Sequence, residues 1–460
     1  MPCTEFFTQE FSNLDLKDSR LVRRAVSIGN TLLSSPGSCI QEVFTSKKEA
    51  RCAYDFFSNP KVKWLNLLSN HQAQTKQRIQ DSTSQIIYLI QDSTFYTYSN
   101  HKAKIDIGNI GKQGRFTQFG FLQHTSFCVA GNDIPLGVLE LDFIGYDDEL
   151  SSFSYREGFE TFASSRWRRF LAQTEAKLKG IGKEVIMLCD READFFEFLT
   201  DLHGSSCKFV IRSKYDRPTG LSGRNHRTKF SELFSRAPYL GDIELVIMDP
   251  HTHKEEPQLF HIKALTNITL PATRRGARHP QNKLPPIKLN VVEASNGRDH
   301  WVLLTNLPAH TFQEAAFVVE SYRKRWHIES FHKVLKTAYK AENVYLHSSR
   351  EAVQSLLTLI NIAAYQTYWL IHQSRQAEEM PATQHFSLHE IAALHVYLYS
   401  RLPSPHTQLS LKEAYYQVAQ LGGLKNLNNK HPPGILTIYR GIKKLNDLCK
   451  MYEAILSIKT

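Results

Sequence analysis

The sequence predicts an α/β protein whose central sheet is flanked by helical N- and C-terminal domains. An apolar run at 86–90 and strand-like patterns at 119–129 and 136–144 predict neighbouring strands, and a turn at 130–133 joins the last two. From about 159 the pattern alternates between helix and strand up to residue 211. The first 75 residues and those after about residue 386 have mainly the spacing of helices.

The predicted elements follow the order strand, strand, strand, helix, strand, helix, strand, which is the element order of a ribonuclease H-like core. We therefore predict a helical domain over residues 1–75 and a ribonuclease H-like catalytic domain over 76–372. The catalytic domain contains a β-rich insertion at about 215–300, where Pro, Gly and basic residues such as Arg274, Arg275 and Arg278 alternate with short strands. A helical domain over 373–460 follows.

Composition narrows the class of protein. The net charge is +11 and the pI is near 9.1, which favours a polyanionic partner such as nucleic acid. No apolar run is long enough to span a membrane, and the N-terminus lacks the pattern of a signal peptide. The 7 cysteines form no CxxC pair, so we expect reduced thiols in a cytoplasmic protein and no zinc site.

The N-terminal helices are small and basic. Arg20, Arg23 and Arg24 stand beside an apolar stripe, and a second helix is expected over 47–57 with a stop at Pro60. This pattern suits a DNA-binding module, and a solvated charged face explains it equally well.

Two aspartates follow predicted strands. Asp92 comes after the run at 86–90, and Asp190 comes after the run at 185–189. Sites in open α/β sheets form at the carboxyl ends of strands. Taken singly, Asp92 also suits a turn and Asp190 also suits a helix N-cap.

A helix beginning near Gln313 carries a polar row. Tyr322, Arg325, Glu329 and Lys336 lie within about 60° of one another at roughly 100° per residue. Ile328, Phe331, Val334 and Leu335 fall on the opposite side and would anchor the helix in a core. Glu329 alone would be an ordinary surface residue, and His327 and His332 are expected on the helix surface.

Three carboxylates on two strand ends and one helix suggest a metal site. Oxygen donors are what Mg²⁺ prefers, and two ions about 3.5–4 Å apart can drive an in-line phosphoryl displacement. Tyr322, Arg325 and Lys336 suit backbone phosphates. Trp301 and Trp326 suit stacking of an unpaired base, and core packing explains them as well.

Several segments of the sequence resemble those of a known protein family. The segments Asp190–Asp194 (DREAD), Phe209–Lys214 (FVIRSK) and Tyr322-x2-Arg325-x3-Glu329-x6-Lys336 resemble the DDE transposases of the insertion-sequence-four family, which is named for this Y-R-E-K spacing. Asp92-Ser93-Thr94 resembles the family's first-aspartate motif, and the likeness spans nearly the whole chain.

The resemblance implies a cut-and-paste DNA transposase that uses two Mg²⁺ or Mn²⁺ ions. It assigns Asp92, Asp190 and Glu329 to metal binding and catalysis, with DNA contacts from Tyr322, Arg325, Lys336, Arg212, Trp301, Trp326, Lys333, Arg20, Arg23 and Arg24. It also implies terminal inverted repeats and target DNA as partners, a homodimer with C-terminal contacts, no membrane, and a bacterial, nucleoid-associated location. A structure-selective nuclease and a non-catalytic DNA-binding regulator are the alternative functions.

Overall fold

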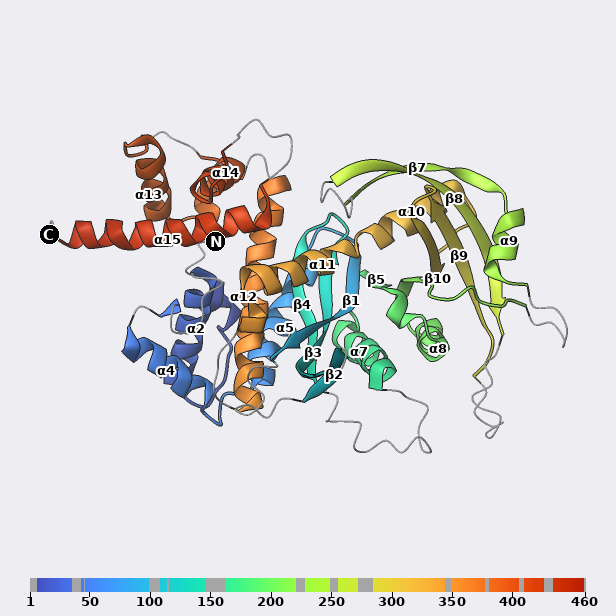
Figure 1. Cartoon of the computed structure of the whole chain (residues 1–460), viewed down its shortest axis with the longest axis horizontal. Helices are drawn as coiled ribbons and strands as arrows, with labels where there is room; N and C mark the ends of the chain where they lie inside the picture. The colour runs from blue at the N-terminus through green and yellow to red at the C-terminus, as the bar shows by residue number, and fades with distance from the viewer. Residues whose placement is uncertain are drawn as a thin grey trace.

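One mixed sheet runs through the fold of this computed structural model (Figure 1). The described residues are 6–34, 43–44, 46–98, 108–113, 116–145, 162–220, 228–248, 255–271, 284–343, 349–376, 380–404, 409–425 and 433–458. Within them the strands are β1 Ile86–Thr97, β2 Asn109–Gln113, β3 Phe116–Ala130, β4 Pro135–Ile144, β5 Glu184–Cys189, β6 Lys208–Arg212, β7 Tyr239–Met248, β8 Glu255–Leu270, β9 Ile287–Ser295 and β10 His300–Thr305.

The strand order confirms that the first three predicted strands are neighbours. Through the sheet it is β2-β3-β1-β5-β6-β10-β9-β8-β7, and β4 pairs with β3. The strands β1, β3 and β4 form the antiparallel group, whereas β5 and β6 run parallel to β1. The β-rich segment at about 215–300 does not form a sheet of its own, because β9 pairs with β10 and so extends the central sheet. Arg274, Arg275 and Arg278 lie outside the described residues.

Helices cover both faces of the sheet. On β1, Tyr88 and Ile90 face one core while Ile87 and Leu89 face the other, as expected for a strand buried on both sides. The helices are α1 Phe6–Glu10, α2 Ser19–Ser34, α4 Lys47–Phe57, α5 Trp64–Asp81, α7 Phe162–Leu178, α8 Phe196–Gly204, α9 Phe230–Arg236, α10 Phe312–Arg323, α11 Trp326–Lys333, α12 Arg350–Gln376, α13 Leu388–Tyr399, α14 Leu411–Leu421 and α15 Ile435–Ile458.

Two long helices cross the domain limits expected from sequence. Residue 75 falls inside α5, which packs on β4, and residue 372 falls inside α12, which contacts α2, α5 and β4. In Figure 1, α12 stands between the helices α2 and α4 and the sheet. None of the described helices has the length and apolar character needed to cross a membrane.

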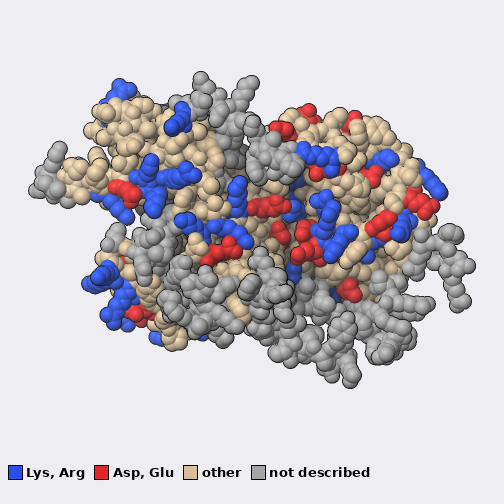
Figure 2. Space-filling model, in the orientation of Figure 1, with Lys and Arg blue, Asp and Glu red and all other residues tan. Residues whose placement is uncertain are grey.

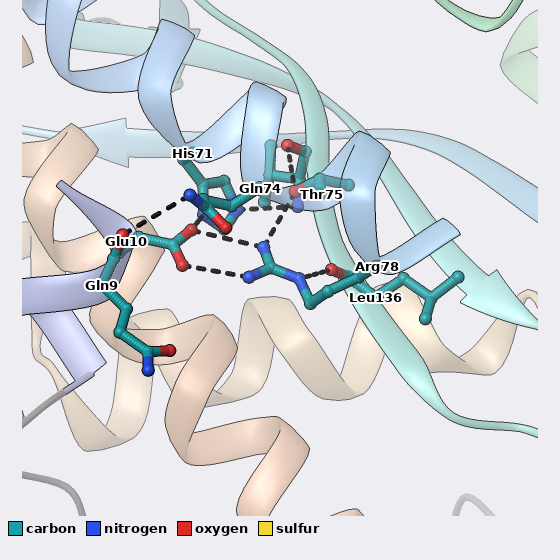
Figure 3. Close-up of polar contacts among 8 residues, drawn as sticks. Gln9, Glu10, His71, Gln74, Thr75, Arg78 and Leu136 are labelled. Atoms are coloured by element: carbon teal, nitrogen blue, oxygen red, sulfur yellow. Dashed lines mark hydrogen bonds and ion pairs between the residues drawn. The ribbon is translucent and has the colours of Figure 1, made fainter. Parts of the chain in front are cut away.

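A buried carboxylate joins the N-terminal segment to α5 (Figure 3). Glu10 of α1 accepts from Nδ1 of His71 and from Nη1 of Arg78, the latter at 3.0 Å. Burial opposes its charge, but Arg78 and His71 lower the Glu10 pKa to about 2. The amide of Val138 donates to Nε2 of His71 at 3.0 Å, so a neutral His71 donates to Glu10 through Nδ1.

Arg78 and His71 of this cluster also bond the backbone of strand β4. Nε of Arg78 donates to the Leu136 carbonyl at 2.6 Å. The next residue, Gly137, has a φ of +138°. A Cβ atom at this position would lie 2.2 Å from Oγ1 of Thr75 on α5. A side chain has no room there, so glycine is needed for α5 to approach β4 this closely.

Candidate active site

Sheet register places Asp92 and Asp190 side by side. The last parallel pair between β1 and β5 is Gln91 with Cys189, so the two aspartates follow it at the same edge. The expectation that the strand ends before Asp92 is wrong, because β1 continues to Thr97 while it remains paired with β3. Asp92 therefore lies within a strand, at the point where its neighbour β5 ends.

Asp190 also caps the turn that follows it. Its Oδ1 accepts from the Glu192 amide at 2.9 Å, and the capped element is a 3₁₀ turn, Arg191–Ala193, rather than the start of α8. The capping interpretation of Asp190 is thus correct and does not remove the residue from the site, because the cap occupies one carboxylate oxygen.

The polar row was predicted to lie on one continuous helix, but the structure divides that helix. The helix divides into α10 and α11 at a turn, Lys324–Arg325, and passes into a π-helical segment, Val334–Ala338. The expected apolar anchor is confirmed, since Ile328, Phe331, Val334 and Leu335 are all buried. Tertiary contacts at the break outweigh the regular helical period, and π segments are frequent at functional sites.

Arg325 links the two sides of the site. Its Nη2 bonds Oε1 of Glu329, and its Nη1 lies 3.7 Å from Oδ2 of Asp92. Burial and the charge of Asp190 raise the Asp92 pKa to about 7, partly offset by Arg325, and Glu329 adds a smaller repulsion. Three carboxylates thus act on one another, with one guanidinium among them.

Their side chains are not arranged around a metal ion as they stand. Over the described residues, no three His, Cys, Asp or Glu side chains form a group that could hold one. Glu329 is instead paired with Arg325. The donor set is all oxygen and suits Mg²⁺ chemically. Figure 2 shows acidic side chains in the middle of this face with Lys and Arg on both sides.

Tyr322 lies deeper than a DNA-contacting residue would require, and Arg212 is half-buried. Tyr322 is buried, and its ring packs edge-on against Trp301 at 5.4 Å between centroids. Nη2 of Arg212 donates to the His300 carbonyl at 3.0 Å, and burial lowers the Arg212 pKa. The Nε atoms of Arg212 and Arg325 are buried without a hydrogen-bond partner among the described residues.

The other residues predicted to contact DNA near the carboxylates differ in exposure. Trp301 is half-buried between Tyr322 and Phe260, so the core-packing interpretation fits it. Trp326 is 45% exposed and free to meet a ligand. Lys333 is exposed, and Lys336 lies 3.6 Å from a carboxylate oxygen of Glu342.

The N-terminal arginines lie on α2, away from these residues. Arg20 and Arg23 are exposed and Arg24 is half-buried. Arg20 is paired with Asp18, with Nη2 and Oδ2 3.1 Å apart. Because α12 separates α2 from the sheet, the structure does not bring these arginines to the carboxylates.

Two histidines of α11 lie deeper than predicted. His327 and His332 were expected on the helix surface, and both are buried. Burial lowers the pKa of His332 to about 3, so its ring is neutral. Helical spacing could have predicted this burial, because residues four apart lie on the same face of a helix. His327 precedes the buried Phe331 by four residues, and His332 follows the buried Ile328 by four.

Asp194 was missed as an organising residue. Its buried side chain accepts from Oγ of Ser213 at 3.0 Å, the Lys214 amide at 2.6 Å and Nε of Arg217 at 2.9 Å. One carboxylate therefore shapes the loop that follows β6 and Arg212. A charged residue this deeply buried requires such partners.

Two models of protein families match the chain. The model of the transposase DNA-binding domain matches residues 3–62, and the model of the transposase DDE domain matches residues 163–365. The second match includes Asp190 and Glu329 and begins after Asp92, whose place beside Asp190 comes from the sheet register.

A solved structure overlaps more loosely. It is a cryo-EM structure of the piggyBac transposase synaptic complex with hairpin DNA, at 8% identity and a TM-score of 0.37, covering 98% of this chain and 80% of that one. An overlap of this quality adds no weight to the assignment. The chain carries a transposase DNA-binding domain followed by a transposase DDE domain, and these two matches support its identification as a DDE transposase.

Proposed function

We propose that this protein is a cut-and-paste transposase of the insertion-sequence-four type, with Asp92, Asp190 and Glu329 as its catalytic carboxylates. The observation that carries the proposal is the register of β1 and β5, which places Asp92 beside Asp190 while Arg325 connects Asp92 to Glu329. The Y-R-E-K spacing from Tyr322 supports the finer family assignment.

Asp92, Asp190 and Glu329 would hold Mg²⁺ or Mn²⁺, with two ions as the expected number. Bound ions would supply activation of the attacking hydroxyl and stabilisation of the leaving oxygen. The protein's own task is to bring the carboxylates together and to keep them ionised. Arg325 performs part of that task in the free chain, since its charge opposes the rise in the Asp92 pKa.

Basic residues around the carboxylates would bind the phosphates of the transposon end. The guanidinium groups of Arg212 and Arg325 support this role, because arginine forms charge-assisted hydrogen bonds with phosphate and Nη1 of Arg325 lies only 3.7 Å from Oδ2 of Asp92. Lys333 and Lys336 add positive charge along the same helix. Trp326, the exposed tryptophan, is the better candidate for stacking a flipped base than the half-buried Trp301, whose ring packs against Tyr322.

The outer domains would bind DNA ends and a second copy of the chain. Exposed Arg20 and Arg23, with Arg24, lie inside the matched transposase DNA-binding domain, which supports a role in recognising terminal inverted repeats. Exposed apolar side chains in the C-terminal region suit a homodimer contact. They are Leu388 and Tyr397 on α13, Leu402 just after α13, and Met451 and Ile455 on α15. Action on transposon and target DNA would place the protein at the bacterial nucleoid, in the cytoplasm.

The proposed reaction is end nicking, hairpin formation and resolution, and strand transfer. Glu329→Ala should abolish cleavage of a duplex carrying the terminal repeat while leaving its binding largely intact. Glu232→Ala is a matched control, because Glu232 is also a helical glutamate paired with an arginine four residues away. Residual Mg²⁺-dependent cutting by the Glu329→Ala variant would refute the assignment.

A further inference from the structure

The chain overwinds where α10 meets α11. The amide of Arg325 donates to the carbonyl of Tyr322 at 2.9 Å, that of His327 to Lys324 at 3.0 Å, and that of Ile328 to Arg325 at 3.1 Å. These bonds span three residues rather than four, which is the 3₁₀ pattern. The break therefore sets the direction in which Arg325 and the following Glu329 project.

The carboxylate of Asp133 contacts one residue in the turn, Lys324, and one residue of α11, His327. Oδ1 of Asp133, in the turn between β3 and β4, lies 2.6 Å from Nζ of Lys324 and 3.1 Å from Nε2 of His327. Asp133 has a left-handed backbone, with φ +67°. Burial opposes its charge, but the bonds from His327 and Lys324 hold the Asp133 pKa well below its usual range.

Other contacts secure the same segment to two more elements. Tyr368 of α12 lies with its hydroxyl 2.7 Å from Nδ1 of His327. Because ionised Asp133 can only accept, Nε2 of His327 carries the proton and Nδ1 accepts from Tyr368. Nζ of Lys324 lies 5.5 Å from the ring centre of Tyr88 on β1.

Arg325 reaches the other way, to Glu329 and to Asp92 of β1. The contacts of Asp133 with Lys324 and His327 therefore hold the backbone of the break without using the Arg325 guanidinium. We propose that Asp133 is a positioning residue for the reaction proposed above, on which this inference rests: it holds the helix break so that Glu329 stays opposite Asp92 and Asp190.

The test uses the full-length protein, a duplex carrying the terminal repeat, and Mn²⁺ as the probe. Asp133→Asn keeps the shape of the side chain and tolerates the left-handed backbone, but it removes the charge. We expect the Mn²⁺ concentration for half-occupancy of the protein–DNA complex, measured by electron paramagnetic resonance, to rise about tenfold, as for loss of an outer-shell partner. DNA affinity should not change.

Asp242→Asn is the matched control, because Asp242 also bonds a histidine, His261, and lies in the distant β7. Lys324→Met should reproduce the Mn²⁺ effect, and the double variant with Asp133→Asn should be no worse than either alone. Lys324→Met also serves as the test if Asp133→Asn does not fold.

A purely structural role would lower the unfolding temperature and leave Mn²⁺ binding unchanged, and that result overturns the inference. Failure of the wild-type protein to cleave the duplex would instead refute the proposed function. The two failures are therefore distinguishable.

Discussion

Replacing Asp92 with Asn should stabilise the metal-free protein at neutral and alkaline pH. The Asp92 carboxyl is only 18% exposed, and its pKa rises from 3.8 to about 7. Burial is the main cause and Asp190 adds repulsion. Asparagine has no charge to bury, yet its amide oxygen can still accept from the Ser93 amide, as Oδ1 of Asp92 does at 2.8 Å.

The magnitude follows from the shift. One pKa unit corresponds to about 1.4 kcal/mol, so the ionised carboxylate costs at most about 4 kcal/mol, and residual solvent contact lowers this to about 2–4 kcal/mol. Between the unfolded and folded pKa values the folded state binds more protons, so wild-type stability falls as pH rises toward 7. The advantage of Asp92→Asn should grow over that range and level off above it.

Urea unfolding in EDTA at several pH values between about 5 and 8.5 measures this difference. Asp242→Asn is a suitable control, because hydrogen bonds from Tyr239 and His261 lower the pKa of that carboxyl. Equal or lower stability of Asp92→Asn at pH 8, or a difference independent of pH, would refute the electrostatic reasoning. Added Mg²⁺ should narrow the difference, because only the wild-type protein keeps all three carboxylates.

Three further substitutions test other parts of the structure. Glu10→Gln should cost about 3–5 kcal/mol in urea unfolding, because Arg78 loses its buried anion; the loss should shrink in acid, as wild-type Glu10 protonates between about 4.5 and 2. Gly137→Ala should cost at least about 1–3 kcal/mol, since its Cβ would overlap Thr75. Trp326→Ala should change stability by less than about 0.5 kcal/mol while slowing hairpin formation more than first nicking; equal slowing would contradict base stacking.

Much of the sheet could be predicted from local pattern. The run at 86–90 is buried on both faces, and the alternation after residue 159 became α7, β5, α8 and β6. The strand β1 was predicted too short, because Gln91 to Thr97 are polar or mixed and the residues after Gln91 pair only with β3. Local pattern also could not show that β9 pairs with β10, since that pairing depends on strands brought together by folding.

For the candidate site, too, some features follow from local sequence and others only from the tertiary structure. Sequence spacing alone predicted Asp92, Asp190, Glu329 and their basic neighbours as site residues, because apolar runs, helical phase and residue chemistry are local properties. Only the tertiary structure decided that the helix breaks at Lys324, that Asp133 grips the break, and that Arg325 stands between Asp92 and Glu329. The physical reason is distance along the chain: Asp133 and Lys324 are 191 residues apart, and no local pattern encodes a contact of that separation.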